Sequence, residues 1–358
     1  MARALDLAWR GWGRVHPNPL VGAVVLAGGE LIGEGYHAEF GGPHAEPQAL
    51  RMAGDRARGA TVVVTLEPCA HTGRQPPCAA ALLAAGVGRV VIALPDPNPV
   101  AAGGAALLRT AGVAVDIGLM RSAAAAQNAA FLHRHRDAGR PFVALKLATS
   151  IDGRIADHSG RSKWISGPEA REWVQWLRAG FDAIAVGGRT AAADDPSLTV
   201  RGALVPRVTP RRVIFDRTLA LPPDGALART AGDVPVTVVA APEAAGGSRA
   251  AALRAVGATV AAAGSLREAL AQLRADGVAS LLVEGGGRLA GALLADGLVD
   301  RLYWVQSPLL LGERGVPAFS GIPAPALDDA ARWRVVERRP LGADTLLVVD
   351  HPACSPES

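Results

Sequence analysis

Several features are scarce in this sequence, and each scarcity excludes a class of protein. Three cysteines among 358 residues are too few for the disulfide framework of a small secreted protein. No run of eighteen apolar residues occurs, so no segment is expected to span a membrane. The first residues, MARALDLAWRGWG, have neither the apolar core nor the cleavage site of a signal peptide. We therefore expect a cytoplasmic protein whose reduced thiols are free to bind metal.

Lysine and aromatic residues are scarce as well. Of the 37 basic residues only Lys146 and Lys163 are lysines, and the arginines are dispersed rather than gathered into a basic arm. Aromatic residues make up 4% of the chain, and the formal net charge is only +4. Single-stranded nucleic acid is usually bound by a basic face studded with aromatic side chains. The composition therefore argues against nucleic acid as a partner.

Hydrophobic residues are plentiful, at 49% of the chain, and the length suits about two domains. The N-terminus is expected to be a helix with Leu5, Ala8, Trp9 and Trp12 on one face. The first half then alternates between strands and helices, as in a layered α/β fold. Strands are expected at 20–27, 31–36, 60–66, 87–94 and 113–117, and helices at 47–53, 77–85, 101–111 and 120–136.

A charged stretch that ends in glycine and proline, HRHRDAGRP at 133–141, is interpreted as the domain boundary. Its histidines could instead bind metal, but a solvated linker is the preferred interpretation. The expected domains are therefore 1–138 and 141–350. In the second domain, a helix is expected at 169–179 and strands at 142–149, 183–186, 212–216, 235–240, 259–262, 280–283, 302–305, 333–337 and 345–349. The stretches 202–210 and 221–234 read as surface loops.

Two of the three cysteines lie in one short stretch, TLEPCAHTGRQPPC at 65–78. Upstream of Cys69 and Cys78 stands the string HAE, which places His44 and Glu46 at the expected start of a helix. An imidazole and two thiolates suit Zn²⁺ and leave its fourth position open for water. The carboxylate of Glu46 would carry a proton from that water to a departing amine. This set predicts a zinc-dependent hydrolytic deaminase.

Two plainer interpretations stay open on these residues alone. Cys69 and Cys78 could be small buried hydrophobic residues and His44 a core histidine, although their order beside Glu46 argues against this. The zinc could also be structural, which would require a fourth ligand. His71 is available for that position.

The order H-A-E…P-C…C resembles the zinc-dependent nucleotide and cytidine deaminase superfamily. That group usually has C-x-x-C, whereas eight residues, AHTGRQPP, separate the cysteines here. This expanded form is similar to the deaminase family of riboflavin biosynthesis, as is HPNPLVGAVV at 16–25. The resemblance implies that Asn18 holds a pyrimidine ring. It also implies a pocket lined by His71, Thr72 and Arg74, whose extra donors suit a ribosyl phosphate; His37 is either a pocket residue or a surface residue.

The second domain opens with PFVALKLATSIDG at 141–153. Lys146, Ala148, Ser150 and Asp152 alternate in it and are expected to share one face of a strand. Because the chain otherwise uses arginine, Lys146 indicates a need for a compact ammonium group, although it could also be a lysine that snorkels at a strand end.

Near the end of the chain, LLVEGGGRL at 281–289 places a strand before three glycines and a helix. Bare glycines let backbone N–H groups approach a phosphate at a helix N-terminus. Taken alone, the stretch could be a tight packing turn or a Rossmann fingerprint. It lies outside a first βαβ unit, however, and lacks the acidic residue expected about twenty positions later.

With SKWISG at 162–167 and AADDPSLTVR at 192–201, these segments resemble the reductase domain of the bifunctional riboflavin-biosynthesis family. The resemblance covers nearly the whole chain, deaminase first and reductase second. It implies a cytidine-deaminase-like three-layer α/β/α domain followed by a dihydrofolate-reductase-like α/β domain, with zinc in the first and NADPH in the second.

The same resemblance implies roles for individual residues of the reductase domain. NADPH contacts fall on Ala148, Trp164, Thr190, Asp194, Gly286, Gly287 and Arg288, within a turn that runs to Ala292. Substrate contacts fall on Ser162, Arg178, Leu198, Arg201 and Glu284, with Lys146 near the ribose. Lys146 and Asp194 are both candidates for the proton donor. Asp216 either meets the NADPH ribose or caps a loop.

We therefore predict a bifunctional enzyme of riboflavin biosynthesis. Hydrolytic deamination of 2,5-diamino-6-(5-phosphoribosylamino)pyrimidin-4-one, with Glu46 carrying the proton, precedes NADPH-dependent reduction of the ribosyl group of 5-amino-6-(5-phosphoribosylamino)uracil to ribityl. The expected partners are these small substrates, without nucleic acid or membrane, and the family implies a homo-oligomer. Two rivals are a nucleic-acid deaminase with an appended binding domain and a non-catalytic protein with structural zinc. Cys354, in a polar tail, is expected to be inert.

Overall fold

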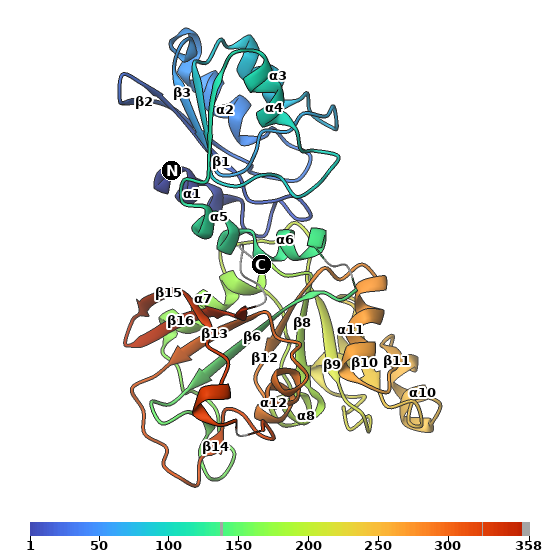
Figure 1. The fold of residues 1–358 in the computed structure, drawn as a ribbon. Coiled ribbons are helices and arrows are strands. Elements are labelled where there is room, and N and C mark those ends of the chain that lie inside the picture. Colours follow the sequence, from blue (N-terminus) through green and yellow to red (C-terminus); the bar gives the residue numbers. More distant parts are fainter. Residues whose placement is uncertain (137–138, 324, 353–358) are drawn as a thin grey trace. The chain divides into compact units, whose positions relative to one another are not determined.

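The structure, a computed structural model, describes residues 1–136, 139–323 and 325–352. Its contacts divide it into two compact units, one formed by residues 1–136 and the other by the described residues after them. Residues 137–138, within the expected boundary, and Cys354 lie outside the described residues. Each unit has a central sheet of its own (Figure 1). No helix of the described residues is long and apolar enough to cross a bilayer.

A five-stranded sheet forms the middle of the first unit. β1 (Gly22–Ala27) lies antiparallel between β2 (Glu30–Tyr36) and β3 (Thr61–Val64). β4 (Arg89–Ile92) and β5 (Ala114–Ile117) continue the sheet parallel to β3. The β-branched runs of β3 and β4 are buried on both faces, as parallel strands between helical layers must be.

Helices cover both faces of this sheet and give three layers (Figure 1). One face is packed by small apolar side chains of α2 (Ala45–Ala53), α3 (Cys78–Ala84) and α4 (Gly104–Thr110). The other face receives α1 (Ala2–Ala8). Short helix segments also occur at Trp9–Gly11 and Gly54–Ala57.

The apolar face expected for the N-terminal helix is only partly right. Leu5 and Ala8 are buried, but Trp9 is 37% exposed. The α-helix ends at Ala8 and the chain tightens into a 3₁₀ turn at Trp9. A 3₁₀ turn advances three residues per turn instead of 3.6, so Trp9 leaves the buried stripe, whereas Trp12 still packs, partly buried, against Ala8, Val15 and Leu20.

The single helix expected over 120–136 is wrong, because the structure has α5 (Arg121–Gln127) and α6 (Ala129–Arg136), separated at Asn128. The buried Asn128 amide accepts the Leu20 N–H at 2.8 Å and donates to the Leu20 carbonyl at 3.0 Å. It therefore satisfies both backbone groups of Leu20, as a neighbouring strand would. This bond pair ties α5 and α6 to the segment that carries Asn18.

A nine-stranded sheet forms the middle of the second unit, in the order β11-β10-β9-β8-β12-β6-β13-β16-β15. Neighbouring strands from β11 to β13 run parallel, and β16 and β15 are antiparallel. The strands are β6 (Phe142–Thr149), β8 (Ala183–Gly187), β9 (Arg211–Phe215), β10 (Val236–Ala240), β11 (Thr259–Ala262), β12 (Ser280–Glu284), β13 (Arg301–Gln306), β15 (Arg334–Leu341) and β16 (Asp344–Asp350). β7 (Arg154–Ala156) and β14 (Val316–Pro317) form a separate pair.

Apolar helix faces bury both sides of this sheet. One core joins alternate residues of β6 to α11 (Leu266–Ala275) and α12 (Gly287–Ala295). A second core joins β8, β9 and β10 to α8 (Gly188–Asp194), α9 (Ala226–Arg229) and α10 (Ser248–Ala255). The remaining elements are α7 (Pro168–Arg178) and a 3₁₀ turn at Leu327–Asp329.

The parallel strands bring distant loops to one edge of the sheet. The segments that follow β8, β9, β11 and β12 all leave from carboxyl ends and therefore lie along that edge, which is where open α/β sheets bind ligands. The shared face expected for Lys146, Ser150 and Asp152 is wrong in part. β6 ends at Thr149, and the Ser150 hydroxyl donates to Asp152 Oδ1 at 2.6 Å within a turn.

Candidate active sites

Three side chains of the first unit converge as a metal-ligand set. His44, Cys69 and Cys78 place their ligand atoms within 4.8 Å of one another. His44 Nδ1 lies 3.2 Å from the sulfur of Cys78 and 3.7 Å from that of Cys69. The backbone N–H of Cys78 donates to the Cys69 sulfur at 3.3 Å. An N-terminal helix N–H favours a thiolate, so the backbone here prepares an anionic ligand.

This donor set fits zinc with one coordination position left open. One nitrogen and two sulfurs are ligands that Zn²⁺ accepts, and three protein ligands are typical of catalytic zinc. Within the described residues, the cluster around His44 contains no fourth His, Cys, Asp or Glu, and His71 is outside it. The geometry therefore does not favour the structural zinc site that His71 would have completed.

Glu46 lies beside this cluster in the first turn of α2. It is 3% exposed and lines the same cavity as His44 and Cys69. Burial raises the pKa of Glu46, and the nearby His44 opposes that rise. A buried carboxyl group that is not itself part of the ligand cluster can exchange protons with a molecule in the cavity.

The cavity over the cluster has a volume of about 280 Å³. Asn18 enters it and lies 3.1 Å from His37, whose other ring nitrogen is 3.1 Å from the Pro43 carbonyl. His37 is thus a buried pocket residue rather than a surface residue. Hydrogen bonding on both sides fixes its ring, and burial lowers its pKa, which favours the neutral imidazole.

The long segment between the cysteines supplies part of the cavity wall. His71, Arg74 and Gln75 line it, whereas Thr72 is exposed and is not among the lining residues. His71 Nδ1 is buried without a hydrogen-bond partner, and a buried polar atom of this kind is normally satisfied by a bound group. The Arg74 guanidinium stacks over Phe40 at 4.8 Å, so a cation stands at the cavity wall.

Sequence reasoning missed Glu67, Asp96 and Asn98, which also line this cavity. Glu67 accepts N–H groups of Asp96, Gly103 and Ala105 at 2.9 to 3.2 Å and so holds two loops together. Burial raises the pKa of Asp96 to about 6. The available signal was positional: Asp96 follows buried β4 as Cys69 follows buried β3, and carboxyl ends of adjacent parallel strands meet.

A second cavity, of about 1690 Å³, lies along the carboxyl edge of the nine-stranded sheet. Arg178 binds Glu284 through two hydrogen bonds of 2.6 and 2.9 Å and donates to the Thr199 carbonyl at 2.9 Å. Burial disfavours the Glu284 carboxylate, but the charge and hydrogen bonds of Arg178 hold its pKa below the usual value. β12 and β6 place Glu284 opposite Lys146 in register.

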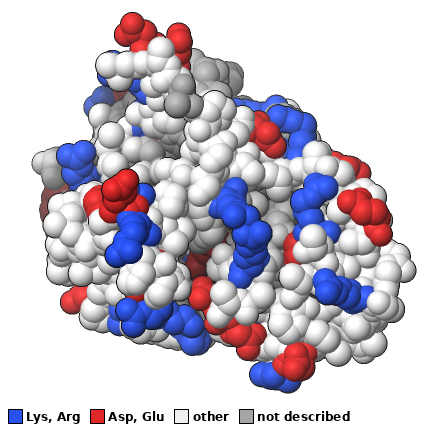
Figure 2. Space-filling model, turned by 90° about the horizontal axis from the view of Figure 1, so that it is seen from below, with Lys and Arg blue, Asp and Glu red and all other residues white. Residues whose placement is uncertain are grey.

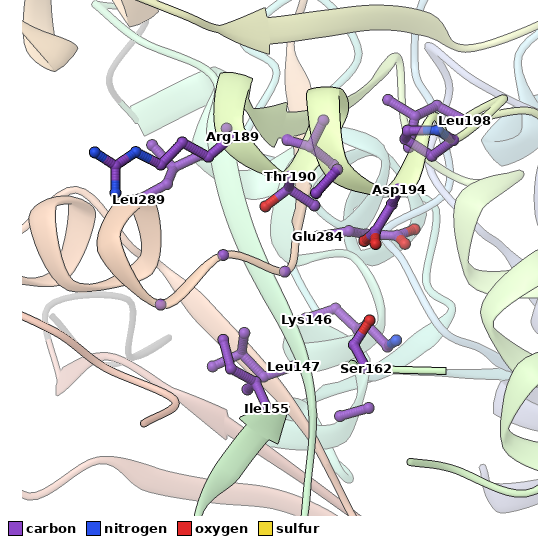
Figure 3. A pocket seen from close by; sticks show the side chains of 18 of the residues that line it. Lys146, Leu147, Ile155, Ser162, Arg189, Thr190, Asp194, Leu198, Glu284 and Leu289 are labelled. Carbon is purple, nitrogen blue, oxygen red and sulfur yellow. The ribbon is translucent and has the colours of Figure 1, made fainter. Parts of the chain in front are cut away.

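Lys146 is the one ammonium group in this buried set. Burial lowers its pKa, and the charge of Glu284 opposes that change. In Figure 3 the Lys146 side chain points toward Ser162, and Glu284 enters the same cavity from the neighbouring strand. A lysine whose proton is destabilised and which faces a cavity can give that proton to a bound molecule.

The three glycines after β12 form a cradle that a side chain would fill. Gly286 has φ +81°, and a Cβ there would lie 2.9 Å from Thr190 Oγ1. A Cβ on Gly287 would lie 2.5 Å from the Pro317 carbonyl oxygen. Only glycine fits these positions. The turn opens onto the N-terminus of α12, which favours a phosphate, so the donor arrangement fits the diphosphate of NADPH.

The other residues predicted for this domain also border the cavity. Trp164, 68% exposed, carries the Arg171 guanidinium at 4.8 Å from its ring. The lining set includes Lys146, Ala148, Ser162, Trp164, Arg178, Thr190, Asp194, Leu198, Arg201, Glu284, Gly286, Gly287 and Arg288. Asp216 also lines the cavity, and its carboxylate accepts the Leu221 N–H at 2.8 Å, so the contact with the NADPH ribose and the loop cap both stay predictions. Sequence reasoning missed Arg189, Arg217 and Ser265, which also line the cavity.

Two sequence families match this arrangement. The RibD C-terminal domain matches residues 141–347, more than half of the chain, and the cytidine and deoxycytidylate deaminase zinc-binding region matches residues 1–94. The riboflavin biosynthesis protein RibD of Escherichia coli strain K12 is 44% identical, with 97% of each chain covered. The chain belongs to the RibD family. The Mycobacterium tuberculosis RibD protein is 38% identical over 97% of this chain and 95% of its own.

Solved structures of RibD proteins agree with the fold of both units. The RibD structure from Acinetobacter baumannii has a TM-score of 0.80 at 39% identity, with 98% of this chain and 97% of that chain covered. A Thermotoga maritima protein, described as a diaminohydroxyphosphoribosylaminopyrimidine deaminase/5-amino-6-(5-phosphoribosylamino)uracil reductase, has a TM-score of 0.81 at 35% identity, with the same coverage.

This RibD-family chain is therefore a bifunctional enzyme of riboflavin biosynthesis, a deaminase and a reductase. Its deaminase uses zinc and its reductase uses NADPH. The family, fold class, two activities and two cofactors predicted from the sequence are confirmed. The roles of individual residues and the domain limits 1–138 and 141–350 stay predictions.

Proposed function

We propose that the first unit carries the deamination and the second unit the reduction, each in the cavity described above. The observation that carries this proposal is the separation of chemistry between the cavities. Nucleophile activation and a proton carrier are available only where His44, Cys69 and Cys78 meet Glu46, among the described residues. A phosphate cradle and a half-buried lysine, Lys146, line the other cavity.

In the first cavity, His44, Cys69 and Cys78 hold zinc, which when bound supplies an activated water as the nucleophile. Glu46 takes the proton from that water and delivers it to the amino group that leaves the pyrimidine as ammonia. Asn18 donates to the ring, and its bond to His37 at 3.1 Å keeps its amide oriented. The buried position of Glu46 keeps bulk water from competing for the proton.

The substrates we propose are those of the Thermotoga maritima relative. In the first cavity, the pyrimidine lies over the ligand cluster and the ribosyl phosphate reaches the segment between the cysteines. Arg74 supplies a planar cation for the phosphate, and His71 supplies the unpaired buried nitrogen. A volume of about 280 Å³ is of the size that one small-molecule substrate fills.

In the second cavity, NADPH when bound supplies a hydride to C1 of the ribosyl group. The bond from C1 to the ring oxygen breaks as the new C–H bond forms, so that oxygen needs a proton. Lys146 donates it, and Glu284 holds Lys146 in its charged form. Arg178 keeps Glu284 ionised through the bonds of 2.6 and 2.9 Å. Asp194 is the alternative donor, and Ser162, Leu198 and Arg201 bound the substrate side.

The contacts to NADPH that we propose follow the edge of the sheet. Ala148, Trp164 and Asp194 border the nicotinamide, and Thr190 with the turn at Gly286 to Arg288 holds the diphosphate. We also propose that the protein is cytoplasmic, binds no nucleic acid and forms a homo-oligomer. These three statements rest on composition and on the family resemblance.

One incubation tests the whole proposal. The zinc-loaded chain is mixed with the deaminase substrate, with and without NADPH, and products are followed by mass spectrometry. Without NADPH we expect only the deaminated product. It is about 1 mass unit heavier than the substrate, because an NH₂ group is replaced by OH. With NADPH a further two hydrogens are gained. Reduction before deamination, or no deamination, would contradict the proposed order.

A further inference from the structure

Two arginines of the second cavity take no part in the chemistry proposed above. Arg189 stands two residues after the end of β8, and Arg217 stands two residues after the end of β9. β8 and β9 are parallel and pair Gly187 with Phe215. The register therefore brings Arg189 and Arg217 out of the sheet side by side, from strands that are hydrogen-bonded neighbours.

The contact between the two loops is close. A Cβ on Gly188 would lie 2.4 Å from the Asp216 side chain, so the residues that precede Arg189 and Arg217 touch. Both arginine side chains are exposed and line the cavity. Both loops therefore bring a guanidinium group to the same cavity, and each of these positive charges would attract a bound anion.

No carboxylate neutralises this pair. Within the part of the chain that the structure describes, neither Arg189 nor Arg217 forms an ion pair. Arg217 makes only a long hydrogen bond, 3.4 Å, to the Gly264 carbonyl. Asp216, which precedes Arg217, also lines the cavity, but it is 4% exposed and its carboxylate accepts the Leu221 N–H. The pair therefore retains donors and positive charge for a ligand.

Arg189 lies at the far end of the cavity from the reacting groups, and Arg217 leaves the neighbouring strand beside it. Figure 3 shows Arg189 and Asp194 at opposite ends of α8, with Lys146 and Ser162 on the side of Asp194 and the glycine turn between. Ser265, the N-cap of the ten-residue α11, lines the cavity on the side of Arg217. Figure 2 shows basic side chains beside a hollow on the face of this unit seen from below.

We propose that Arg189 and Arg217 bind the 2′-phosphate of NADPH and make this chain select NADPH over NADH. The proposal rests on NADPH lying in this cavity, as stated above. With the nicotinamide near Lys146 and the diphosphate on the Gly286 turn, the adenosine end extends toward these two arginines. The 2′-phosphate is the one group that distinguishes the two cofactors, and two guanidinium forks match its oxygens.

Equilibrium binding tests this without any turnover. Dissociation constants of NADPH, NADH, 2′,5′-ADP and 5′-ADP are measured by titration calorimetry for the native chain, R189A, R217A and the double variant. Each single substitution is expected to raise the dissociation constants of NADPH and 2′,5′-ADP about ten- to a hundredfold, as for loss of a charged hydrogen-bond partner. The dissociation constants of NADH and 5′-ADP should change less than about threefold, since neither molecule carries the 2′-phosphate.

Arg211 provides the matched control. It is an exposed arginine at the opposite end of β9, where it donates to the Asp276 carbonyl at 2.9 Å. R211A should leave all four dissociation constants unchanged. Raising the salt concentration should weaken NADPH binding to the native chain and to R211A more steeply than to the double variant.

The outcomes separate this inference from the proposed function. An unchanged ratio of NADPH to NADH affinity in the double variant overturns the role of the arginines. Equal affinity of the native chain for the two cofactors also overturns it. If the native chain binds neither cofactor, the assignment of the cavity to NADPH fails first. Retained affinity of each variant for NADH and 5′-ADP, which bind in the same cavity, confirms that the second unit of the substituted chains is folded.

Discussion

The two cavities of this chain differ in size and in how the sequence builds them. The first has about 280 Å³ and takes its metal ligands from residues 44 to 78, within one short stretch. The second has about 1690 Å³ and joins Lys146 to Glu284 across the sheet. A pyrimidine ring that reacts at one bound metal ion needs only a few side chains close together. NADPH and a substrate that exchange a hydride need a long cavity along the edge of a sheet.

The difference also appears in how charge is stabilised. In the first cavity His44, Cys69 and Cys78 form a cluster that can hold a metal ion, and Glu46 is buried beside it. In the second, the carboxylate of Glu284 pairs with Arg178 and stands opposite Lys146 in register, so one negative charge is shared by two cations. Chemistry in the first unit should therefore depend on zinc, and chemistry in the second on the charges of its side chains.

Removing zinc is expected to have the largest effect and to act on one cavity only. A strong chelator should abolish deamination, because His44, Cys69 and Cys78 can then no longer activate water. Reduction of the deaminated substrate should continue at its native rate. Both rates are measured on the same sample, with zinc content determined by atomic absorption. Loss of reduction along with deamination would break the separation between the cavities.

Replacing Glu46 by Gln is expected to lower the turnover number of deamination by about 10²- to 10⁴-fold, the usual contribution of a general acid–base group. Bound zinc and the rate of reduction should be unchanged. Glu30, exposed on β2 and paired with Arg56, supplies the control variant E30Q, which should retain both activities. Retained deamination by E46Q would refute the proposed proton carrier.

Replacing Lys146 by Ala is expected to lower reduction by about 10- to 100-fold, as for loss of a charged donor worth about 1.5–3 kcal/mol. Deamination should be unaffected. K146R keeps a charge but not the compact ammonium group, so its reduction rate should remain low. Native-like reduction by K146A would leave Asp194 as the proton donor, and D194N would then be the impaired variant.

Replacing Gly286 by Ala should weaken NADPH binding by about tenfold, because the new Cβ meets Thr190 Oγ1 at 2.9 Å in a left-handed backbone. Backbone strain alone costs about 1–2 kcal/mol. Gly277 has φ +90° and nothing within 4 Å of its position for a Cβ, so G277A carries the strain without the crowding. Titration calorimetry should show normal NADPH affinity for G277A, and equal loss in both variants would contradict the cradle.

The smallest expected effect is on the pH profile of reduction. Burial lowers the pKa of Lys146, and Glu284 opposes this, so reduction should decline as the pH rises through that lowered value. E284Q removes the opposing charge, and the decline should move to lower pH by about one unit. The profile of deamination is the internal control. A decline that moves to higher pH in E284Q would exclude Lys146 as the protonated donor.

Sequence and structure agree best where chemistry restricts the residue type. The motif around His44, Cys69 and Cys78 is read directly, because few residues can serve as zinc ligands. The strand at Phe142–Thr149 has the predicted limits, since its burial on both faces demands a continuous apolar run. The glycine turn is visible for a similar reason, as other residues would not fit.

The sequence predictions agree less well with the structure where contacts between distant residues determine the local conformation. The helix over 120–136 is interrupted because Asn128 bonds Leu20, a partner 108 residues away that no local pattern contains. Thr72 turns outward although its neighbours His71 and Arg74 line the cavity. Arg189 and Arg217 resemble any dispersed arginine until the register of β8 and β9 brings them together. Pairing of strands supplies information that composition lacks.

The bonds from Asn128 to Leu20 bear on how much of the chain the deaminase unit requires. The deaminase zinc-binding match ends at residue 94, yet Phe131 of α6 lines the first cavity and Gln127 donates to the Leu5 carbonyl at 2.9 Å. A free-standing deaminase cut from this gene just after residue 94 would lose a wall of its own pocket. The smallest deaminase unit that keeps its pocket intact therefore extends through α6 to residue 136.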